Sequence, residues 1–184
     1  VSISNSDTRL AEHADVALKI DNSMEFLKSF VKTLIDQKFA DKDKIDKTAN
    51  GFDELVKYVG NAPDIADASK AAKMYGEAKK AIIVADEDTV SEEAIKLIAD
   101  AAVITEKIGK PHRGIIIARS KANTQGIIDM GFTVPAYQLL DDIEKEEVKG
   151  AVIIGEDLAA ADERIKELLG KLEFTVCLDL YMTE

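Results

Sequence analysis

The sequence has very few of the residues that build metal centres and disulfides. Its 184 residues include one cysteine, Cys177, and two histidines, His13 and His112. A single cysteine excludes an intramolecular disulfide, a CxxC pair and a self-contained iron–sulfur site. Two histidines leave little for a zinc site. We therefore expect this chain to bind no metal by itself.

Positive charge and long apolar runs are also scarce. Lysine and arginine number 24 against 35 aspartates and glutamates, which gives a formal net charge of −11. Such a surface repels phosphate backbones and anionic lipid headgroups, so we expect no nucleic-acid partner and no direct membrane insertion. No apolar run approaches the roughly 18 residues of a spanning helix, and no signal peptide opens the chain. The sequence therefore predicts a cytoplasmic protein, and its start at Val1 indicates a processed product or a cut piece.

Four short apolar runs, mostly of β-branched residues, mark the second half of the chain. They occupy residues 81–85, 114–118, 151–154 and 174–178. Strands that are buried on both faces of a parallel sheet have this composition. Helical patterns separate the runs, at residues 91–108, 139–148 and 157–169. The expected fold class is α/β: an open, mostly parallel sheet with helices on both faces, in a Rossmann-like arrangement.

The first 77 residues carry a different pattern. Two strand candidates, at 1–4 and 16–20, flank a polar turn. Residues 23–75 are expected to be helical, with Ser23 as a helix cap, because apolar side chains recur there at helical spacing. The chain thus divides into three stretches: 1–22 as the trailing piece of a neighbouring α/β unit, 23–77 as a helical segment, and 78–184 as the parallel-sheet domain.

Ligands of open parallel sheets bind beyond the carboxyl ends of the strands, so the residues there are candidates for a site. After the first run come Asp86, Glu87 and Asp88, without a GxGxxG motif or a Walker lysine. A nucleotide pyrophosphate would meet negative charge at this turn, which argues against a Rossmann or P-loop nucleotide site. The acidic turn is expected to be a capped helix start.

The segment after the second run carries the most informative set of polar residues. It places cations, side-chain amides and a glycine in one short stretch: Arg119, Lys121, Asn123, Gln125 and Gly126. Together these groups suit a polar, partly anionic heterocycle. Their side chains can donate and accept hydrogen bonds, and the glycine allows a ligand to approach the backbone closely. A surface loop whose amides satisfy their own backbone is an equal alternative from the residues alone.

The last two runs end in a glycine and an aspartate. Gly155 allows a ligand to approach the backbone closely, or else forms a tight turn into the next helix. Asp179 is either a ligand acceptor or a cap of a following element. Cys177 lies within an apolar run, which predicts a thiol in the core rather than a nucleophile.

Four short motifs occur in the order found in one known family. The segment Asn123-Thr-Gln-Gly-Ile-Ile-Asp-Met-Gly131 resembles the N-x-Q-G-x-x-D-M-G signature of molybdopterin oxidoreductases. Residues 8–15 are similar to the family's T-x-x-A-x-x-A-D turn, residues 149–156 to its K-G-x-x-V-x-G-E strand and loop, and residues 179–184 to its D-x-F-x-T-E segment. The resemblance is strongest to the large iron–sulfur subunit of NADH:quinone oxidoreductase (complex I) and to formate dehydrogenase alpha subunits.

The resemblance implies a fragment of a larger enzyme, its central α/β domain. Members begin with a cysteine-rich iron–sulfur region and end with a β-rich domain that closes over a molybdopterin guanine dinucleotide. The parent would thus hold iron–sulfur clusters outside this fragment and the pterin, or would have lost the pterin, while the fragment alone binds neither. The implied partners are the remaining domains of the parent and other subunits of an electron-transfer complex, at the inner face of a membrane.

The resemblance also implies roles for single residues. By position, Arg119 matches the arginine that formate dehydrogenases place beside the metal. Asn123, Gln125 and Gly126, with Lys121 in the same loop, match residues near the pterin. Gly155 and Asp179 match positions on the guanosine side.

This sequence departs from the family pattern at three of its loops. Lys121 and Ala122 replace a glutamine and an asparagine, Ser4-Asn5-Ser6 replaces an Asp-Pro-Arg, and Asp157-Leu158 replaces an Asn-Pro. These losses weaken guanine-dinucleotide recognition and favour the complex I type of subunit, where the domain is structural.

Three hypotheses follow. The first is a fragment of the large subunit of an NADH dehydrogenase or a formate dehydrogenase, inactive alone, whose parent transfers electrons through iron–sulfur clusters. The second is a non-catalytic scaffold domain of a complex I-like subunit. The third is an unrelated α/β domain that binds a small polar molecule.

Overall fold

The computed structural model describes residues 1–161 and 163–181. Contacts divide the chain into two compact units, Val1–Ala122 (unit 1) and the residues from Asn123 onward (unit 2). This boundary differs from those of the expected division into 1–22, 23–77 and 78–184, which stays a prediction.

Unit 1 opens with a small parallel strand pair joined by a helix. Strands β1 (Ser2–Ser4) and β2 (Ala17–Lys19) pair in parallel and flank helix α1 (Arg9–His13). Both strands were predicted, but a helix replaces the expected polar turn. The reason is a local cap: the Thr8 hydroxyl accepts a hydrogen bond from the Ala11 amide at 3.2 Å.

Four helices follow, which confirms that the next stretch is helical. They are α2 (Ser23–Asp36), α3 (Lys42–Ile45), α4 (Phe52–Gly60) and α5 (Ala66–Glu77). Asn22, rather than Ser23, caps α2, because its side-chain oxygen accepts from the amides of Met24 and Glu25. An asparagine one residue earlier satisfies two of the free amides at the helix start.

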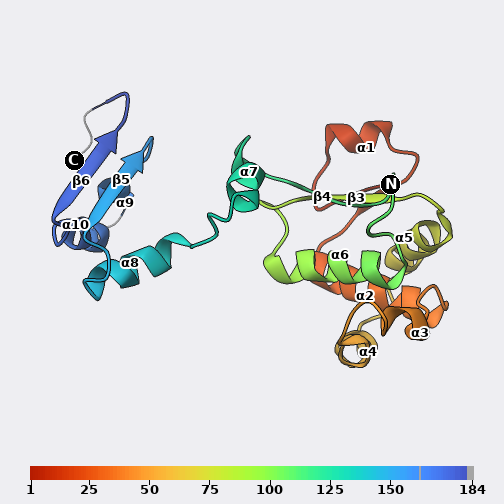
Figure 1. Ribbon diagram of the computed structural model, residues 1–184. Helices are drawn as coiled ribbons and strands as arrows, with labels where there is room; N and C mark the ends of the chain where they lie inside the picture. Colours follow the sequence, from red (N-terminus) through yellow and green to blue (C-terminus); the bar gives the residue numbers. More distant parts are fainter. Residues whose placement is uncertain (162, 182–184) are drawn as a thin grey trace. The chain divides into compact units, whose positions relative to one another are not determined.

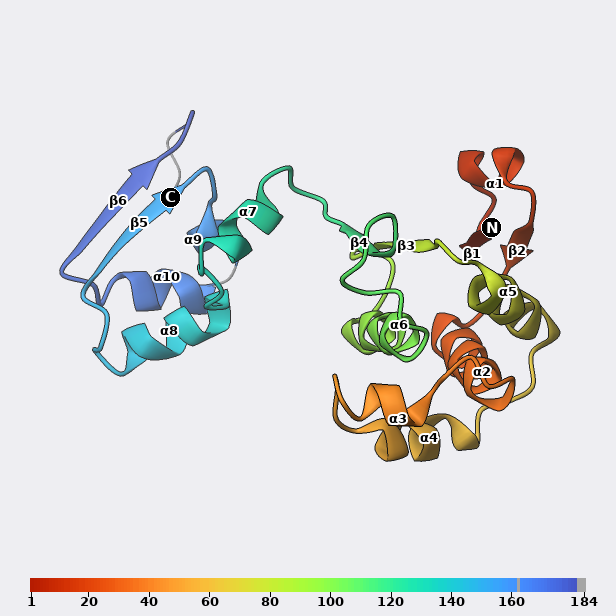
Figure 2. The ribbon, with the colours of Figure 1, turned by 45° about the vertical axis from the view of Figure 1, so that its right-hand side comes forward.

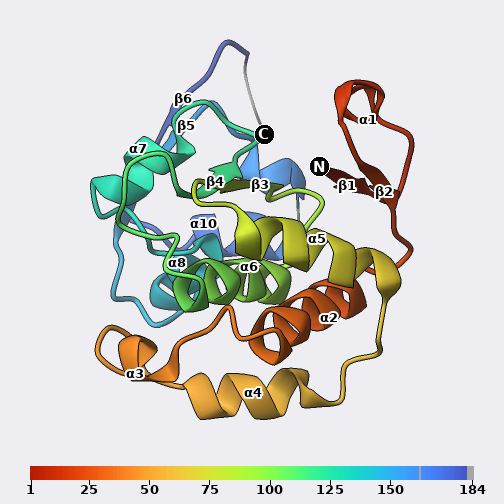
Figure 3. The ribbon, with the colours of Figure 1, turned by 90° about the vertical axis from the view of Figure 1, so that its right-hand side faces the viewer.

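The core of unit 1 forms around α2. This helix packs against α4, α5 and α6 (Glu92–Ile104), an arrangement that Figure 3 shows. Phe26, Val31 and Leu34 of α2 are buried, and Leu97 of α6 joins the same apolar cluster. Each such side chain contributes about 1.5–3 kcal/mol of transfer free energy. The helical segment therefore shares one core with the α/β part of unit 1 and does not form a separate lobe.

A second parallel strand pair completes unit 1. Strands β3 (Ile82–Asp86) and β4 (Gly114–Ala118) run side by side, with α6 as the crossover between them (Figure 1). Ser91 caps α6 as predicted, since its hydroxyl accepts from the Ala94 amide at 3.2 Å. Ala85 is buried on one face of the pair, whereas Val84 and Ile116 are exposed on the other.

Unit 2 holds the third strand pair and several short helices. Strands β5 (Gly150–Ile154) and β6 (Phe174–Leu178) pair in parallel. Helices α8 (Ala136–Glu144) and α10 (Glu163–Leu169) pack side by side (Figure 2). The remaining helices are α7 (Thr124–Asp129) and α9 (Leu158–Ala161). Both α9 and α10 lie within the helix expected over 157–169, and Asp162 between them lies outside the described residues.

The α/β class is confirmed, and the described strands pair in parallel as expected: β1 with β2 and β3 with β4 in unit 1, and β5 with β6 in unit 2. The expected burial on both faces is wrong for β6, because every residue of this strand is exposed, including Cys177, which was expected in the core. The cause is that the apolar composition of these strands does not reveal which faces the helices cover.

None of the described helices combines the length and the apolarity needed to cross a membrane.

Candidate functional site

The carboxyl ends of β3 and β4 form one end of a cavity in unit 1. The Glu87 amide, just after β3, donates to the Ala118 carbonyl of β4 at 3.1 Å, so the residues that follow the two strands are neighbours. The cavity measures about 530 Å³, and its charged lining consists of Glu87, Asp88, Glu92 and Arg119. This is the edge of the sheet at which the sequence predicted a ligand.

Arg119 is held by a charged partner from the neighbouring strand. Its guanidinium donates to a Glu87 carboxylate oxygen at 2.5 Å, and the Ser120 amide donates to the other oxygen at 3.3 Å. Both side chains are 24% exposed, so solvent screens this ion pair less than a surface pair. The pair fixes the arginine against the end of β3.

The electrostatic balance of the cavity is negative. Glu87, Asp88 and Glu92 contribute three carboxylates, and Arg119 is the one cation among the described lining residues. The sequence indicates Arg119 but not its partner Glu87, because the acidic turn that contains Glu87 has the composition of a helix start. The available signal was position: both residues directly follow apolar runs, and parallel neighbours end at the same edge.

The other residues of the loop after β4 have local roles. Lys121 is exposed in unit 1, and Asn123, Gln125 and Gly126 belong to the start of unit 2. Gln125 donates from its side-chain amide to an Asp129 carboxylate oxygen at 2.7 Å. A Cβ on Gly126 would collide with the Asn123 side-chain oxygen, so the glycine allows that side chain to fold over the helix.

Gly155 and Asp179 lie together in unit 2, at the carboxyl ends of β5 and β6. The Gly155 amide donates to the Leu178 carbonyl at 2.9 Å. Gly155 has φ +66°, and a Cβ there would meet no atom within 4 Å, so the space in front of it is open. Asp179 accepts from the Leu180 amide at 2.5 Å.

The candidate residues therefore fall into two groups. Arg119 and Lys121 belong to unit 1, and the other five belong to unit 2. Met182, Thr183 and Glu184 of the last family-like motif lie outside the described residues. Within 1–161 and 163–181, no group of three or more histidine, cysteine, aspartate or glutamate side chains is placed to hold a metal ion.

Known proteins similar to this chain are oxidoreductase subunits. The F420-dependent formate dehydrogenase 2 subunit alpha of Methanococcus maripaludis is 26% identical, over all of this chain and 34% of its own length. Formate dehydrogenase H of Escherichia coli is 26% identical over 92% of the chain and 31% of its length. The assimilatory nitrate reductase catalytic subunit of Bacillus subtilis is 23% identical over all of the chain and 33% of its length. No protein-family model matches the chain.

The chain resembles part of the molybdopterin oxidoreductases. The relatives are the formate dehydrogenase alpha subunits that the motifs pointed to, together with a nitrate reductase, so the resemblance is confirmed. The chain spans about a third of the length of the relatives it matches. The alignment with the Methanococcus subunit covers 233 residues against 184 here, so that relative carries insertions that this molybdopterin-oxidoreductase-like chain lacks.

Proposed function

We propose that the chain is a domain of the large subunit of an electron-transferring oxidoreductase related to formate dehydrogenases, and that it supplies framework rather than reacting groups. The parent is a cytoplasmic molybdopterin-oxidoreductase-type enzyme that works with further domains, iron–sulfur clusters and partner subunits. Within that parent, the carboxyl ends of β3 and β4 border the region where relatives of this family hold a pterin.

The observation that carries the framework role is the Glu87–Arg119 ion pair. The family resemblance would place Arg119 beside a metal, yet its guanidinium lies 2.5 Å from a carboxylate of its own chain. An arginine that must stabilise a reacting group is most effective when its charge is directed at that group. In this chain the charge is directed at the end of the adjacent strand, where it holds β3 and β4 together.

The residues of the cavity do not fit the anionic part of a pterin dinucleotide. A pyrophosphate requires hydrogen-bond donors and positive potential. Three carboxylates line the cavity against one guanidinium, which is already paired. The same carboxylates would repel a pyrophosphate and raise the cost of its desolvation. No step through the pterin is therefore assigned to this chain, and the complex I type of parent, with a structural domain, is the favoured form of the proposal.

A second candidate function is a loaded pterin site in a formate dehydrogenase-type parent. The observation that favours it is the open space before Gly155 beside Asp179, both exposed at the carboxyl ends of adjacent strands. A glycine with free space allows close approach, and an exposed carboxylate accepts hydrogen bonds from a guanine edge. In that case Asp179 would hold the guanosine end.

Metal and pterin analysis of the full-length parent distinguishes the two candidates. The parent is purified from a host that makes molybdopterin, molybdenum and tungsten are measured by mass spectrometry, and pterin by fluorescence after oxidation. The framework role predicts that each chain carries well below one atom of molybdenum or tungsten and well below one pterin. It also predicts that the parent still assembles into its complex. The framework role would be overturned if each chain carried about one molybdenum or tungsten atom and one pterin. The loaded site would then be supported if both were lost in Asp179→Ala but retained in the control Asp141→Ala.

A further inference from the structure

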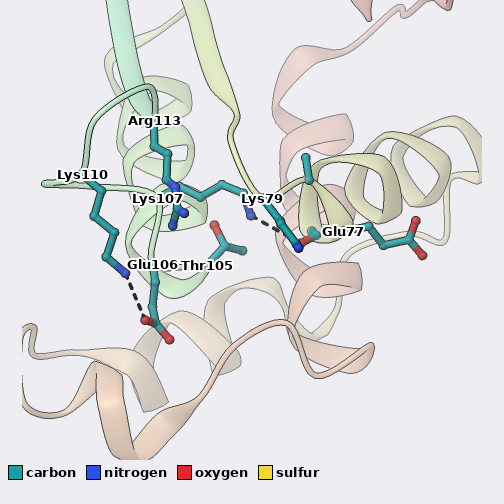
Figure 4. A pocket seen from close by; sticks show the side chains of 9 residues that line it. Glu77, Lys79, Thr105, Glu106, Lys107, Lys110 and Arg113 are labelled. Carbon is teal, nitrogen blue, oxygen red and sulfur yellow. Dashed lines mark hydrogen bonds and ion pairs between the residues drawn. The ribbon is translucent and has the colours of Figure 1, made fainter.

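A basic hollow lies at the opposite ends of β3 and β4 from the Arg119 cavity. It measures about 270 Å³ and is bordered by the end of α5, the segment before β3 and the loop between α6 and β4. Four cations line it, Lys79, Lys107, Lys110 and Arg113, together with the hydroxyl-bearing Thr105 (Figure 4). In a chain with a formal net charge of −11, such a concentration of positive charge is unusual.

Lys107 is the most unusual of these residues, because it is buried. Only 3% of its surface is exposed. Its ammonium lies 4.5 Å from the centroid of the Tyr75 ring and 3.5 Å from the Gly76 carbonyl oxygen. No carboxylate pairs with it among the described residues. A buried cation without an anion is costly unless a counter-charge arrives.

The neighbouring cations increase this demand for an anion. Burial, followed by the nearby positive charge of Arg113, lowers the pKa of Lys107. Glu106 does not relieve the excess, because its carboxylate accepts from Lys44 at 2.9 Å and from Lys110 at 3.5 Å. Figure 4 shows Glu77 pointing away from the other labelled side chains. Among the described residues, no ion pair joins Lys79, Lys107 or Arg113 to a carboxylate, although Glu77 and Glu106 also line the hollow.

The backbone of the α6–β4 loop is held in an uncommon conformation. Glu106 has φ 55° and His112 has φ 62°, both in the left-handed region that residues other than glycine rarely adopt. Such conformations persist where the surroundings fix them, often at ligand sites. Lys107 directly follows the first of these two residues and Arg113 directly follows the second.

A simpler role for the cations is compensation of helix ends. The carboxyl ends of α5 and α6 both border the hollow, and each carries a partial negative charge of about half an electron. Two helix ends would thus offset about one positive charge. Three cations without an acidic partner exceed that amount, so helix-end compensation accounts for only part of the cluster.

We propose that this hollow binds a small dianionic oxyanion of the phosphate class. Its volume lies below the roughly 300–1,000 Å³ of pockets that hold drug-sized ligands, which favours a single phosphate or sulfate group over a dinucleotide. Ammonium and guanidinium groups are the usual partners of phosphate oxygens. The site is separate from the Arg119 cavity and does not depend on the proposed function.

Binding of inorganic phosphate to the 184-residue chain tests the proposal. Calorimetric titration and backbone amide NMR shifts are recorded with sodium phosphate, and with sodium chloride at matched ionic strength. We expect saturable phosphate binding, with amide shifts concentrated in residues 76–79 and 105–113, and a rise in the melting temperature that chloride does not reproduce. No saturation below 50 mM phosphate, or shifts spread over the surface, would overturn the proposal.

Paired variants keep the test independent of folding. Lys79→Gln and Arg113→Gln remove charges at the rim, where substitution spares the core, and each is expected to weaken phosphate binding about tenfold or more. Lys80→Gln is the matched control, since it removes the same charge one residue away from the lining. Equal losses in Lys79→Gln and Lys80→Gln would indicate general electrostatic attraction and contradict a site.

A further titration with a phosphomonoester distinguishes a free phosphate ion from the phosphate group of a larger ligand. A nucleoside monophosphate that binds more tightly than inorganic phosphate, with the same dependence on Lys79 and Arg113, assigns the hollow to a larger phosphorylated ligand. Tighter binding of inorganic phosphate assigns it to the free anion. Both results support the oxyanion site, whereas failure of both ligands to bind refutes it.

Discussion

At the scale of single residues, the Glu87–Arg119 pair leads to a stability prediction. Replacing Glu87→Gln removes the carboxylate that pairs with the partly buried guanidinium of Arg119, and we expect a loss of about 1–2 kcal/mol in the free energy of unfolding. Urea unfolding of the chain measures it. The control is Glu92→Gln, whose partner Lys96 is a surface residue 2.7 Å away, and which should cost well under 1 kcal/mol. Equal losses of unfolding free energy in the two variants would show that the Glu87–Arg119 pair stabilises the chain no more than a surface ion pair.

Asp100 of α6 leads to a prediction about pH. Burial raises the pKa of its carboxyl above the ordinary value. The folded state therefore binds this proton more tightly than the unfolded state, so stability falls as the pH rises through the window between the ordinary and the raised pKa. At neutral pH the charged form costs stability, and Asp100→Asn is expected to be more stable than the parent chain.

The pH dependence of that gain is the decisive measurement. Urea midpoints of the two chains are compared at several pH values from 3 to 8. The advantage of Asp100→Asn should disappear below about pH 4, where the aspartate is protonated in both states. An advantage that is constant across the range would assign it to packing or helix propensity instead of desolvation.

At the scale of elements, a glycine inside α5 reveals a close contact between two segments. A Cβ on Gly76 would lie 2.6 Å from the Phe39 ring, so α5 approaches the segment after α2 with no space for a methyl group. Gly76→Ala should therefore destabilise the chain by about 1–3 kcal/mol, although alanine is the better helix former.

The matched control for Gly76 is the last residue of α4. A Cβ added to Gly60 would meet no atom within 4 Å. Gly60→Ala should stabilise by a few tenths of a kcal/mol up to about 1 kcal/mol. Thermal unfolding of both variants checks the pair, and a stabilised Gly76→Ala would mean that Phe39 moves aside freely.

The sequence predicted the elements of this chain better than their assembly. All four apolar runs are strands, and Ser91 caps α6 as expected, because strand composition and capping are local properties. Which strands pair with one another was not predictable, since pairing depends on contacts between distant segments. For the same reason the exposure of Cys177 was not predicted, since its apolar neighbours in the sequence indicated a buried thiol.

The candidate site shows the same division. Arg119 was identified from its position after a strand, but its carboxylate partner lies 32 positions earlier in the chain, and only the register of β3 and β4 brings the two together. The basic hollow was missed altogether, because Lys107 and Lys79 come from loops that carry no motif. A buried lysine cannot be distinguished from a surface lysine by its neighbours in the sequence.

At the scale of the whole molecule, the two units differ in how much apolar surface they bury. The buried apolar residues of unit 1 include four of α2 and six of α6, whereas those of unit 2, within its described part, are Ile143 and Leu168. Less burial means easier local opening. Hydrogen exchange measured by NMR or mass spectrometry should show amides of β5 and β6 exchanging at least ~10-fold faster than those of α2 and α6. Similar protection of both units would show that they unfold as one.

The exposed strands of unit 2 have a consequence for the protein in solution. Each described strand of the β5–β6 pair has a single partner, and Val152, Ile154, Val176 and Leu178 are exposed on one face. Unpaired strand edges with apolar faces are templates for the addition of further copies. The net charge of −11 opposes such association, because like-charged copies repel each other. Raising the salt concentration screens that repulsion, so the isolated chain should precipitate from concentrated salt sooner than from dilute buffer.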